Sequence, residues 1–565
     1  AWKTTVDGKE GVHLMADIYS STNLPRTNDK KADGNKCEWD GVFYGHNHTI
    51  THAGTEPLFL HVGETGKIMD LKVAGERIAN TNNGWPGVFV LNNSGEISNC
   101  ESSVDITLEG NSTNASTICR SNNGKIINCK NTGNITIENP TAEVKVGGIT
   151  LYSSGTITGC TNTGAINVTG VDVNCLVSGV VLMASGKVSD LENKGDMTVE
   201  ANLSATREIY MGGVIGKCET PEINIIPAGN VVGEIFRCKN SGKLKIQKSG
   251  AFHMKGGCLG GVAASVNTGS STKDCTIFDS CTNSGSISFY EKETILNKNG
   301  FPYGAYAVGG ILGRCSVVKD VYYDFGAKSY TVIRVNCVNT GNIDVCTANG
   351  LPMEDINSGA RQTYVGGIAG SASYAIRSCY SMGRITGKNN IGGIAGEGCD
   401  IFYSYAYNDL DMSGENQGSI AGKVSDDGSL YGNYYVEGGV GGVDGIGYQG
   451  GATPLSYQEL CAKDGVPEAF SQFTITFLAD GEEVASYKCN YGDYLSADQI
   501  PEVPEKEGYY GVWPDYDFSY ITGNRVLEAE YQEWTASIAS AEKNDNNKAL
   551  VMAEGNFYPN AALHL

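Results

Sequence analysis

Apolar and polar residues alternate over short runs along most of the chain. Each run holds four to six residues of high strand propensity and is closed by Gly, Asn or Ser. A period of two is typical of a β-strand with one buried face, and the closing residues are those that tight turns favour. The pattern therefore predicts an all-β protein built from many short strands.

Two signatures recur among these runs, and their recurrence predicts a repeat fold. One is a Gly-Gly pair followed by Ile or Val, as at Gly366-Gly367-Ile368. The other is Cys-x-Asn-x-Gly-x-Ile (or Leu), found at 129–135, 160–166, 238–244, 281–287 and 337–343. At least eight repeats of a basic length of roughly 26 to 31 residues are visible, and the middle ones are longer. We expect a parallel β-solenoid over residues 57–450, with one coil per repeat.

The Cys of the second signature is expected to face the core. Leu191 and Tyr405 are assigned to the same position in two repeats, so this position requires apolar volume rather than a thiol. We expect mostly free thiols, stacked in a ladder at Cys100, Cys129, Cys160, Cys238, Cys281, Cys337 and Cys379. The Asn and Gly that follow are expected to supply the left-handed backbone of a sharp corner.

Insertions lengthen the middle repeats, at 290–306, 315–335 and 344–363. Lengthening a loop costs little closure entropy, and solenoids often collect insertions on the face that binds a partner. Tyrosine offers broad contact area at low entropic cost, although it is also a good strand residue. The predicted ligand-binding residues are Tyr290, Tyr303, Tyr306, Tyr322, Tyr323, Tyr330, Asp355 and Arg361.

The two ends depart from the repeat. Residues 1–56 are expected to form an N-terminal cap with the first coil, since an open solenoid end exposes unpaired edges. A capping box at Ser456 and Glu459 predicts a short helix within a capping segment, 451–470. Alternating strands and a Pro-rich turn predict a separate small β domain at 471–532, and 533–565 is expected to begin a further β domain that the chain end cuts short.

Charge and hydropathy narrow the possible partners. The chain has 41 basic and 63 acidic residues and a formal charge of −22, so it would repel nucleic acid. No run approaches 18 apolar residues, so membrane insertion is not expected. Because the chain begins at Ala1 without a signal-like run, we expect a mature chain whose targeting segment has been removed. A monomer is expected.

Candidate catalytic and metal-binding groups are sparse. His46, His48 and His52 cluster in sequence, but a third ligand beside an i, i+2 pair is not evident. The acidic pairs Asp409 with Asp411 and Asp426 with Asp427 are interpreted as solvated surface carboxylates rather than a glycan-cleaving pair. No metal and no cofactor are predicted, and the chain is predicted not to be an enzyme.

The Gly-Gly-Ile-Ala-Gly runs with their paired Cys-x-Asn-x-Gly-x-Ile runs resemble the GLUG-type repeats of large bacterial surface proteins, notably those of gut Firmicutes. The resemblance covers about residues 85–440, and the run FYGHNHTIT at 43–51 is similar to that family's first-coil motif. It implies a β-solenoid and is nearly silent about the ligand.

The segment 473–531 resembles the Listeria-Bacteroides repeat, a β-grasp-like module of bacterial wall proteins. The similarity rests on its YGDYL run, its Pro turn, the Gly508-Tyr509 pair followed by Trp513, and the closing LEAEY. Together the two resemblances imply a secreted protein of the bacterial cell surface. We expect a non-enzymatic adhesin that binds a host glycan or host protein, such as mucin, immunoglobulin or a matrix component. The alternatives are a structural stalk that displays another domain and, less favoured, a polysaccharide lyase or hydrolase.

Overall fold

The computed structural model describes 21 segments of the chain. They are residues 2–6, 9–20, 39–52, 57–79, 89–205, 207–219, 234–249, 254–268, 277–291, 306–317, 332–334, 336–347, 363–373, 375–387, 389–412, 414–426, 428–438, 440–444, 451–534, 536–543 and 549–555. The chain divides into two compact units, residues 1–463 and 464–565.

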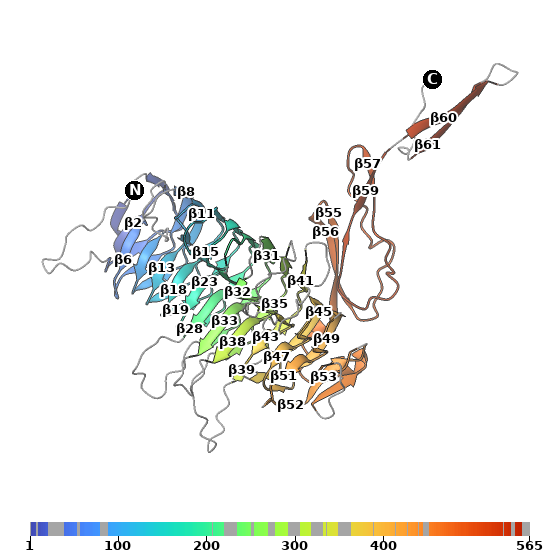
Figure 1. Cartoon of the computed structure of the whole chain (residues 1–565). Coiled ribbons are helices and arrows are strands. Elements are labelled where there is room, and N and C mark those ends of the chain that lie inside the picture. The colour runs from blue at the N-terminus through green and yellow to red at the C-terminus, as the bar shows by residue number, and fades with distance from the viewer. Residues whose placement is uncertain are drawn as a thin grey trace. The chain divides into compact units, whose positions relative to one another are not determined.

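The first unit is a parallel β-solenoid whose coils each pass through four sides. In one coil, side 1 is β14 (Lys125–Ile127), side 2 is β15 (Lys130–Asn131) with β16 (Ile135–Glu138), side 3 is β17 (Val144–Gly147) and side 4 is β18 (Thr150–Ser153). Each strand pairs in parallel with its counterpart in the next coil, and Figure 1 shows these strands lying side by side. The predicted fold class is confirmed.

The stacked strands form long sheets. Side 3 is a nine-stranded sheet from β12 (Asn114–Ser116) to β50 (Gln417–Gly418), and side 4 is an eleven-stranded sheet from β6 (Phe59–Val62) to β51 (Ala421–Val424). In the last coils, side 1 is a four-stranded sheet of β39 (Val332–Arg334), β44 (Ala375–Arg377), β48 (Ile401–Phe402) and β52 (Leu430–Tyr431).

The core is a set of inward-facing columns. Ile97, Ile126 and Ile157 stand opposite one another on successive coils, and each is fully buried. The alternation of apolar and polar residues sets this register, because a slip of one residue would turn every apolar side chain to solvent. The predicted inward face is therefore confirmed at these positions.

The cysteine position of the repeat is buried in every coil that carries it, and Leu191 takes it in one coil, as predicted. The assignment of Tyr405 is wrong. Tyr405 pairs with Tyr380, so Ser404 stands opposite Cys379. The Ser404 hydroxyl accepts a hydrogen bond from the backbone N–H of Cys379 and donates one to a carbonyl of its own coil. The position therefore accepts a small polar group whose hydrogen bonds are satisfied.

The asparagine of the repeat does not form the left-handed corner. Positive φ falls instead on the residue before the cysteine position, as at Asn99 and Asn128. The repeat asparagines are buried and form a ladder, in which each Nδ2 except that of the last, Asn339, donates to the asparagine Oδ1 of the next coil at 2.7 to 2.8 Å. The ladder comprises Asn131, Asn162, Asn193, Asn240, Asn283 and Asn339. Each amide also donates to the carbonyl of the repeat glycine two residues on.

The repeated glycines are required by close backbone approach. An ideal Cβ at Gly148, in the Gly-Gly corner between sides 3 and 4, would lie 2.0 Å from the carbonyl oxygen of Gly179 in the next coil. A Cβ at Gly370, the last glycine of the signature, would lie 2.5 Å from the backbone nitrogen of Val308 on side 3. Neither glycine has a positive φ. The signature therefore folds side 4 tightly against the backbone of side 3.

Both ends of the first unit continue the stack. β2 (Lys9–Leu14) pairs in parallel with β4 (Val42–Tyr44), and β1 (Trp2–Val6) pairs antiparallel with β2. At the other end, β54 (Ala452–Leu455) extends side 2, and the predicted capping box is confirmed at the start of α1 (Tyr457–Cys461).

The described strands of the second unit form one three-stranded sheet and two antiparallel pairs. β55 (Gln472–Ala479) pairs antiparallel with β56 (Glu482–Asn490) and parallel with β58 (Arg525–Glu528). The two antiparallel pairs join β57 (Tyr509–Val512) to β59 (Glu530–Glu533) and β60 (Ala536–Lys543) to β61 (Ala549–Gly555). In the described segments of both units, no helix has the length and apolar character that crossing a lipid bilayer requires.

Candidate interaction surfaces

The three long insertions leave the solenoid at two different junctions. The insertions between β36 (Ile287–Glu291) and β37 (Tyr306–Gly309) and between β41 (Ile343–Thr347) and β42 (Thr363–Gly366) join side 2 to side 3. The insertion between β38 (Leu312–Val317) and β39 joins side 4 to side 1. The strands that flank the two insertions between sides 2 and 3 pair in parallel with the coils before and after, as does β38 on side 4. On side 1, β39 pairs with β44 of the coil after it, and the described strands show no pairing of β39 with β34 (Ile277–Asp279) of the coil before. In the described strands, the scaffold is therefore continuous on sides 2, 3 and 4, whereas the side 1 sheet is interrupted at the third insertion.

Most of the predicted ligand-binding residues lie in segments that the structure does not describe, namely Tyr303, Tyr322, Tyr323, Tyr330, Asp355 and Arg361. Tyr306 is 7% exposed and its ring lies 5.5 Å from that of Phe289, so its side chain packs in the core. Tyr290 is half-buried near the end of β36, with the Lys245 ammonium 5.9 Å from the centre of its ring. Tyr290 is therefore the described member of the set that faces the surface at an insertion.

The three clustered histidines point to separate partners. His46 contacts His13, with Nε2 and Nδ1 2.8 Å apart, while Nδ1 of His48 lies 3.2 Å from an Asp17 carboxylate oxygen. His52 is buried on β5 (Thr49–His52). Among the described residues, no three His, Cys, Asp or Glu side chains converge on a point where a metal could bind.

The acidic pairs lie on the surface. Asp409 and Asp411 are exposed on β49 (Tyr405–Met412), and Asp411 forms an ion pair with Arg384 at 2.6 Å. That carboxylate raises the pKa of the Arg384 guanidinium. Asp426 is exposed, and Asp427 falls among the residues left undescribed. This arrangement gives Asp411 a basic partner on the neighbouring strand, as is typical of a solvated surface pair.

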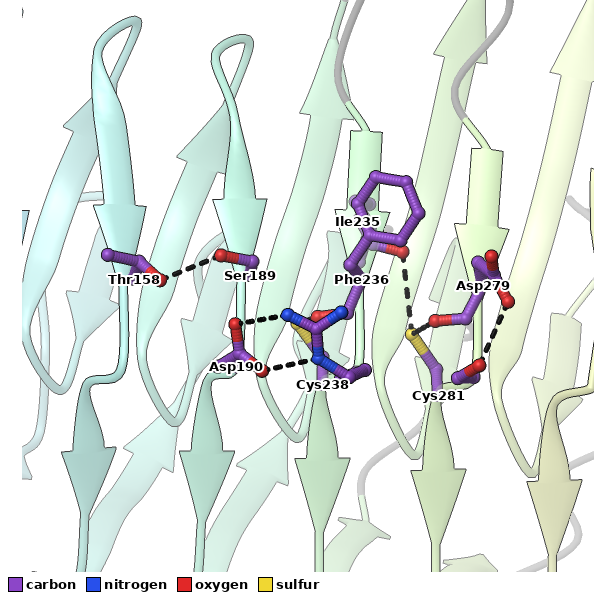
Figure 2. A network of polar contacts seen from close by, with 10 residues as sticks. Thr158, Ser189, Asp190, Ile235, Phe236, Cys238, Asp279 and Cys281 are labelled. Carbon is purple, nitrogen blue, oxygen red and sulfur yellow. Dashed lines mark hydrogen bonds and ion pairs between the residues drawn. The ribbon is translucent and has the colours of Figure 1, made fainter.

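The corner between sides 1 and 2, here called the first corner, carries a polar network in the middle coils (Figure 2). Thr158 and Ser189 share a hydrogen bond of 2.7 Å, and Arg237 donates two hydrogen bonds, of 2.6 and 2.8 Å, to the Asp190 carboxylate. The Arg237 guanidinium holds the pKa of Asp190 below its ordinary value. The Cys281 thiol faces inward and lies 3.7 Å from the carbonyl oxygen of Ile235. These contacts link one coil to the next at the corner.

The same corner becomes aromatic in the last three coils. Its outward side 1 column holds Thr158, Ser189, Phe236 and Asp279 in the middle coils. In the last three coils it holds Arg377, Phe402 and Tyr431, in register with one another. The left-handed corner residue of the middle coil is Tyr403. Tyr403 is 45% exposed and Tyr431 58%, and their rings meet edge to face with centroids 5.5 Å apart.

Aromatic rings also line the side 2 flank of this corner. Tyr380, Tyr405 and Tyr434 stack edge to face with centroid separations of 5.4 and 5.3 Å, and the Lys463 ammonium lies 4.2 Å from the Tyr434 ring. Sequence reasoning missed this cluster because it concentrated on the insertions. The dense tyrosines of the runs FYSYAY at 402–407 and LYGNYY at 430–435 were the available signal.

In comparisons with known proteins, the chain matches no protein-family model, and no match was found among curated proteins or solved structures.

Proposed function

We propose that this protein is a non-enzymatic binding protein of the bacterial cell surface, whose solenoid presents inserted segments to a host glycan or host protein. The surface location rests on the resemblance to GLUG-type and Listeria-Bacteroides repeats. The small second unit would then serve as a spacer.

One observation carries the binding role: on sides 2 and 3, the parallel register continues unbroken across the coils that bear the insertions between these two sides. A stalk that served only as a spacer would need no insertion, whereas a binding scaffold needs variable segments on a rigid frame. The flanking strands supply that frame, and Tyr290 places a tyrosine at the surface where one insertion begins.

The test is deletion of 292–305 and of 348–362, each replaced by a short Gly-Ser linker, in the chain of 565 residues. Adhesion to immobilised mucin, to immunoglobulin and to matrix proteins is measured for wild type and both variants. Loss of adhesion by at least tenfold, with an unchanged circular dichroism spectrum and melting temperature, is the expected result.

The third insertion, 318–331, leaves from the other junction and holds Tyr322, Tyr323 and Tyr330, so its replacement in parallel shows which junction carries the binding. The insertions are not the binding elements if wild type adheres to none of these surfaces. The same conclusion follows if every folded variant, including one in which all three insertions are replaced, adheres as wild type does. In either case the structural stalk becomes the better explanation.

A further inference from the structure

We propose that the first corner of the last three coils is a carbohydrate-binding platform, built around Tyr403 and Tyr431 and separate from the insertions. The ligand class is a glycan that places the C–H face of a pyranose ring on a tyrosine ring. The site goes beyond the proposed role of the insertions, because it lies entirely on the repeated scaffold.

The backbone of Tyr403 is the first observation. Its φ is +51°, in the left-handed region that favours glycine and asparagine. In earlier coils the same corner position holds Asn99, Asn128 and Asp190, which tolerate this conformation well, and in one coil Arg237, whose side chain pairs with Asp190. A tyrosine here adopts an unfavourable backbone for no gain in core packing, and such strain concentrates at functional sites.

The next coil accommodates the ring of Tyr403. Its corner residue is Gly432, and an ideal Cβ there would lie 2.8 Å from Cδ1 of Tyr403. The ring therefore lies over a bare glycine backbone. Tyr431, which precedes Gly432 in the same coil, meets the Tyr403 ring edge to face at an interplanar angle of 89°. The two coils together fix the ring orientation, and a fixed ring loses little entropy when a ligand stacks on it.

Exposure separates these two rings from the other aromatic residues of the solenoid. Among the described residues of the first unit, Tyr19 is the other large apolar side chain of comparable exposure, and it lies far away in sequence on β3 (Ile18–Ser20). Tyr403 and Tyr431 offer both an apolar face and a phenolic hydroxyl, the combination that a sugar ring with its apolar face and hydroxyl rim requires.

Cationic groups border the platform. The Arg377 guanidinium lies 5.5 Å from the centre of the Phe402 ring, and its Nε is buried with no hydrogen-bond partner in the described part of the chain. Because this Nε is buried, Arg377 contributes a positive charge at the edge of the platform rather than a hydrogen bond from that atom, and the charge favours a glycan that carries a carboxylate.

The surroundings favour a glycan over a protein. The corner and side 1 neighbours of the two rings include Ser378, Asp400 and Ser429, and Asp400 already accepts a hydrogen bond from the Ser429 backbone. A stable protein contact needs about 800 Å² per partner with an apolar centre, which two tyrosines set among polar groups do not provide.

The test is binding of the 565-residue chain to an array of mucin-type O-glycans, neutral and sialylated, followed by titration with the best-bound oligosaccharide. Tyr403→Asn restores the residue found at this corner in Asn99 and Asn128, so it removes the ring without disturbing the turn. Tyr431→Ser removes the second ring, and Tyr19→Ser is the matched control. Each corner variant should lose at least tenfold in affinity while the control binds as wild type.

Stability provides a second readout. Tyr403→Asn should retain or raise the melting temperature while it lowers glycan affinity, which a purely structural tyrosine would not do. Deleting the insertions should leave this glycan affinity unchanged, so failure of the platform and failure of the insertion hypothesis are distinguishable. The platform hypothesis is overturned if the folded wild type binds none of the arrayed glycans, if both corner variants bind as wild type does, or if the corner captures a protein and no glycan.

Discussion

The buried asparagine ladder yields the sharpest prediction about stability. Asn193 lies near its middle: its Nδ2 donates to the Gly195 carbonyl at 2.9 Å and to Oδ1 of Asn240 at 2.8 Å, and its Oδ1 accepts from Asn162 at 2.8 Å. In Asn193→Ala, the Asn162 amide keeps its bond to its own coil, whereas Oδ1 of Asn240 loses the side-chain donor it has in the ladder.

The magnitude follows from these contacts. An unsatisfied buried polar group costs about 1–3 kcal/mol, and each further lost hydrogen bond about 1 kcal/mol. Asn193→Ala should therefore lower the free energy of unfolding by about 2–4 kcal/mol. Asn193→Asp should cost more at neutral pH, since a carboxylate cannot donate to Asn240 and is buried without a cation. Burial would raise the pKa of that introduced carboxyl, so its stability should recover as pH falls and the group protonates.

The assay is urea unfolding combined with hydrogen exchange, because a repeat protein need not unfold in one step. Exchange should accelerate first in β25 (Glu192–Asn193) and its neighbours β20 (Thr161–Asn162) and β30 (Lys239–Asn240). Asn167→Ala, on the outward face of β21 (Ile166–Val171), is the matched control and should change the free energy of unfolding by less than about 0.5 kcal/mol. A cost for Asn193→Ala that equals the control would refute the view that the ladder stabilises the stack.

Three further predictions concern the core. Ile368→Asp buries an unpaired carboxylate and should cost several kcal/mol, so an unchanged melting temperature would show that this side chain faces solvent. Gly148→Ala should destabilise the folded protein by at least about 1–3 kcal/mol, because the added Cβ overlaps the backbone of the next coil. Gly438→Ala is the control, since its Cβ would meet nothing within 4 Å, and it should be nearly neutral in the same thermal melts. Equal effects of the two substitutions would contradict the argument that Gly148 is required by close backbone approach. Burial raises the pKa of Cys119 to about 12 and of Cys258 to about 11, so the neutral thiols favour the folded state. This contribution to the free energy of unfolding is fully present below the thiol pKa of the unfolded chain and is lost as pH rises from about 9 toward these values. Over that pH range, the urea midpoint should therefore fall less in a Cys119→Ala/Cys258→Ala variant than in wild type. Separately, alkylation in denaturant without reductant should label most cysteines. Fewer than about four labelled cysteines would contradict the free-thiol ladder.

The fold was largely predictable, because each coil must bury its apolar face against the next and the repeats record that requirement many times. The position of Leu191 in the cysteine column followed from sequence spacing alone. The Tyr405 assignment failed because the shortened repeat shifts the register by one residue, and strand pairing settles which residue faces inward. The role of the repeat asparagine was also misassigned. An asparagine followed two residues later by glycine looks the same in the sequence whether it forms a turn or a buried hydrogen-bonded ladder.

The candidate sites were predicted less well. Tyr306 sits at the end of an insertion in sequence, yet β37 turns its side chain into the core. The corner formed by Tyr403 and Tyr431 joins residues from different coils, and no local pattern reports that their rings meet. Sequence spacing identifies which residues occupy the same position in successive coils, but not which of their side chains meet at the surface.

The sequence alone determined the strand period, the repeat and the parallel stacking, because hydrophobic alternation and a fixed repeat length act locally and recur in every coil. The tertiary structure decided the rest: which glycines are needed for backbone contact, why the asparagines are buried, and where aromatic rings gather at the surface. These depend on distances between residues of neighbouring coils, about 25 to 56 positions apart in the chain, which only the pairing register brings together.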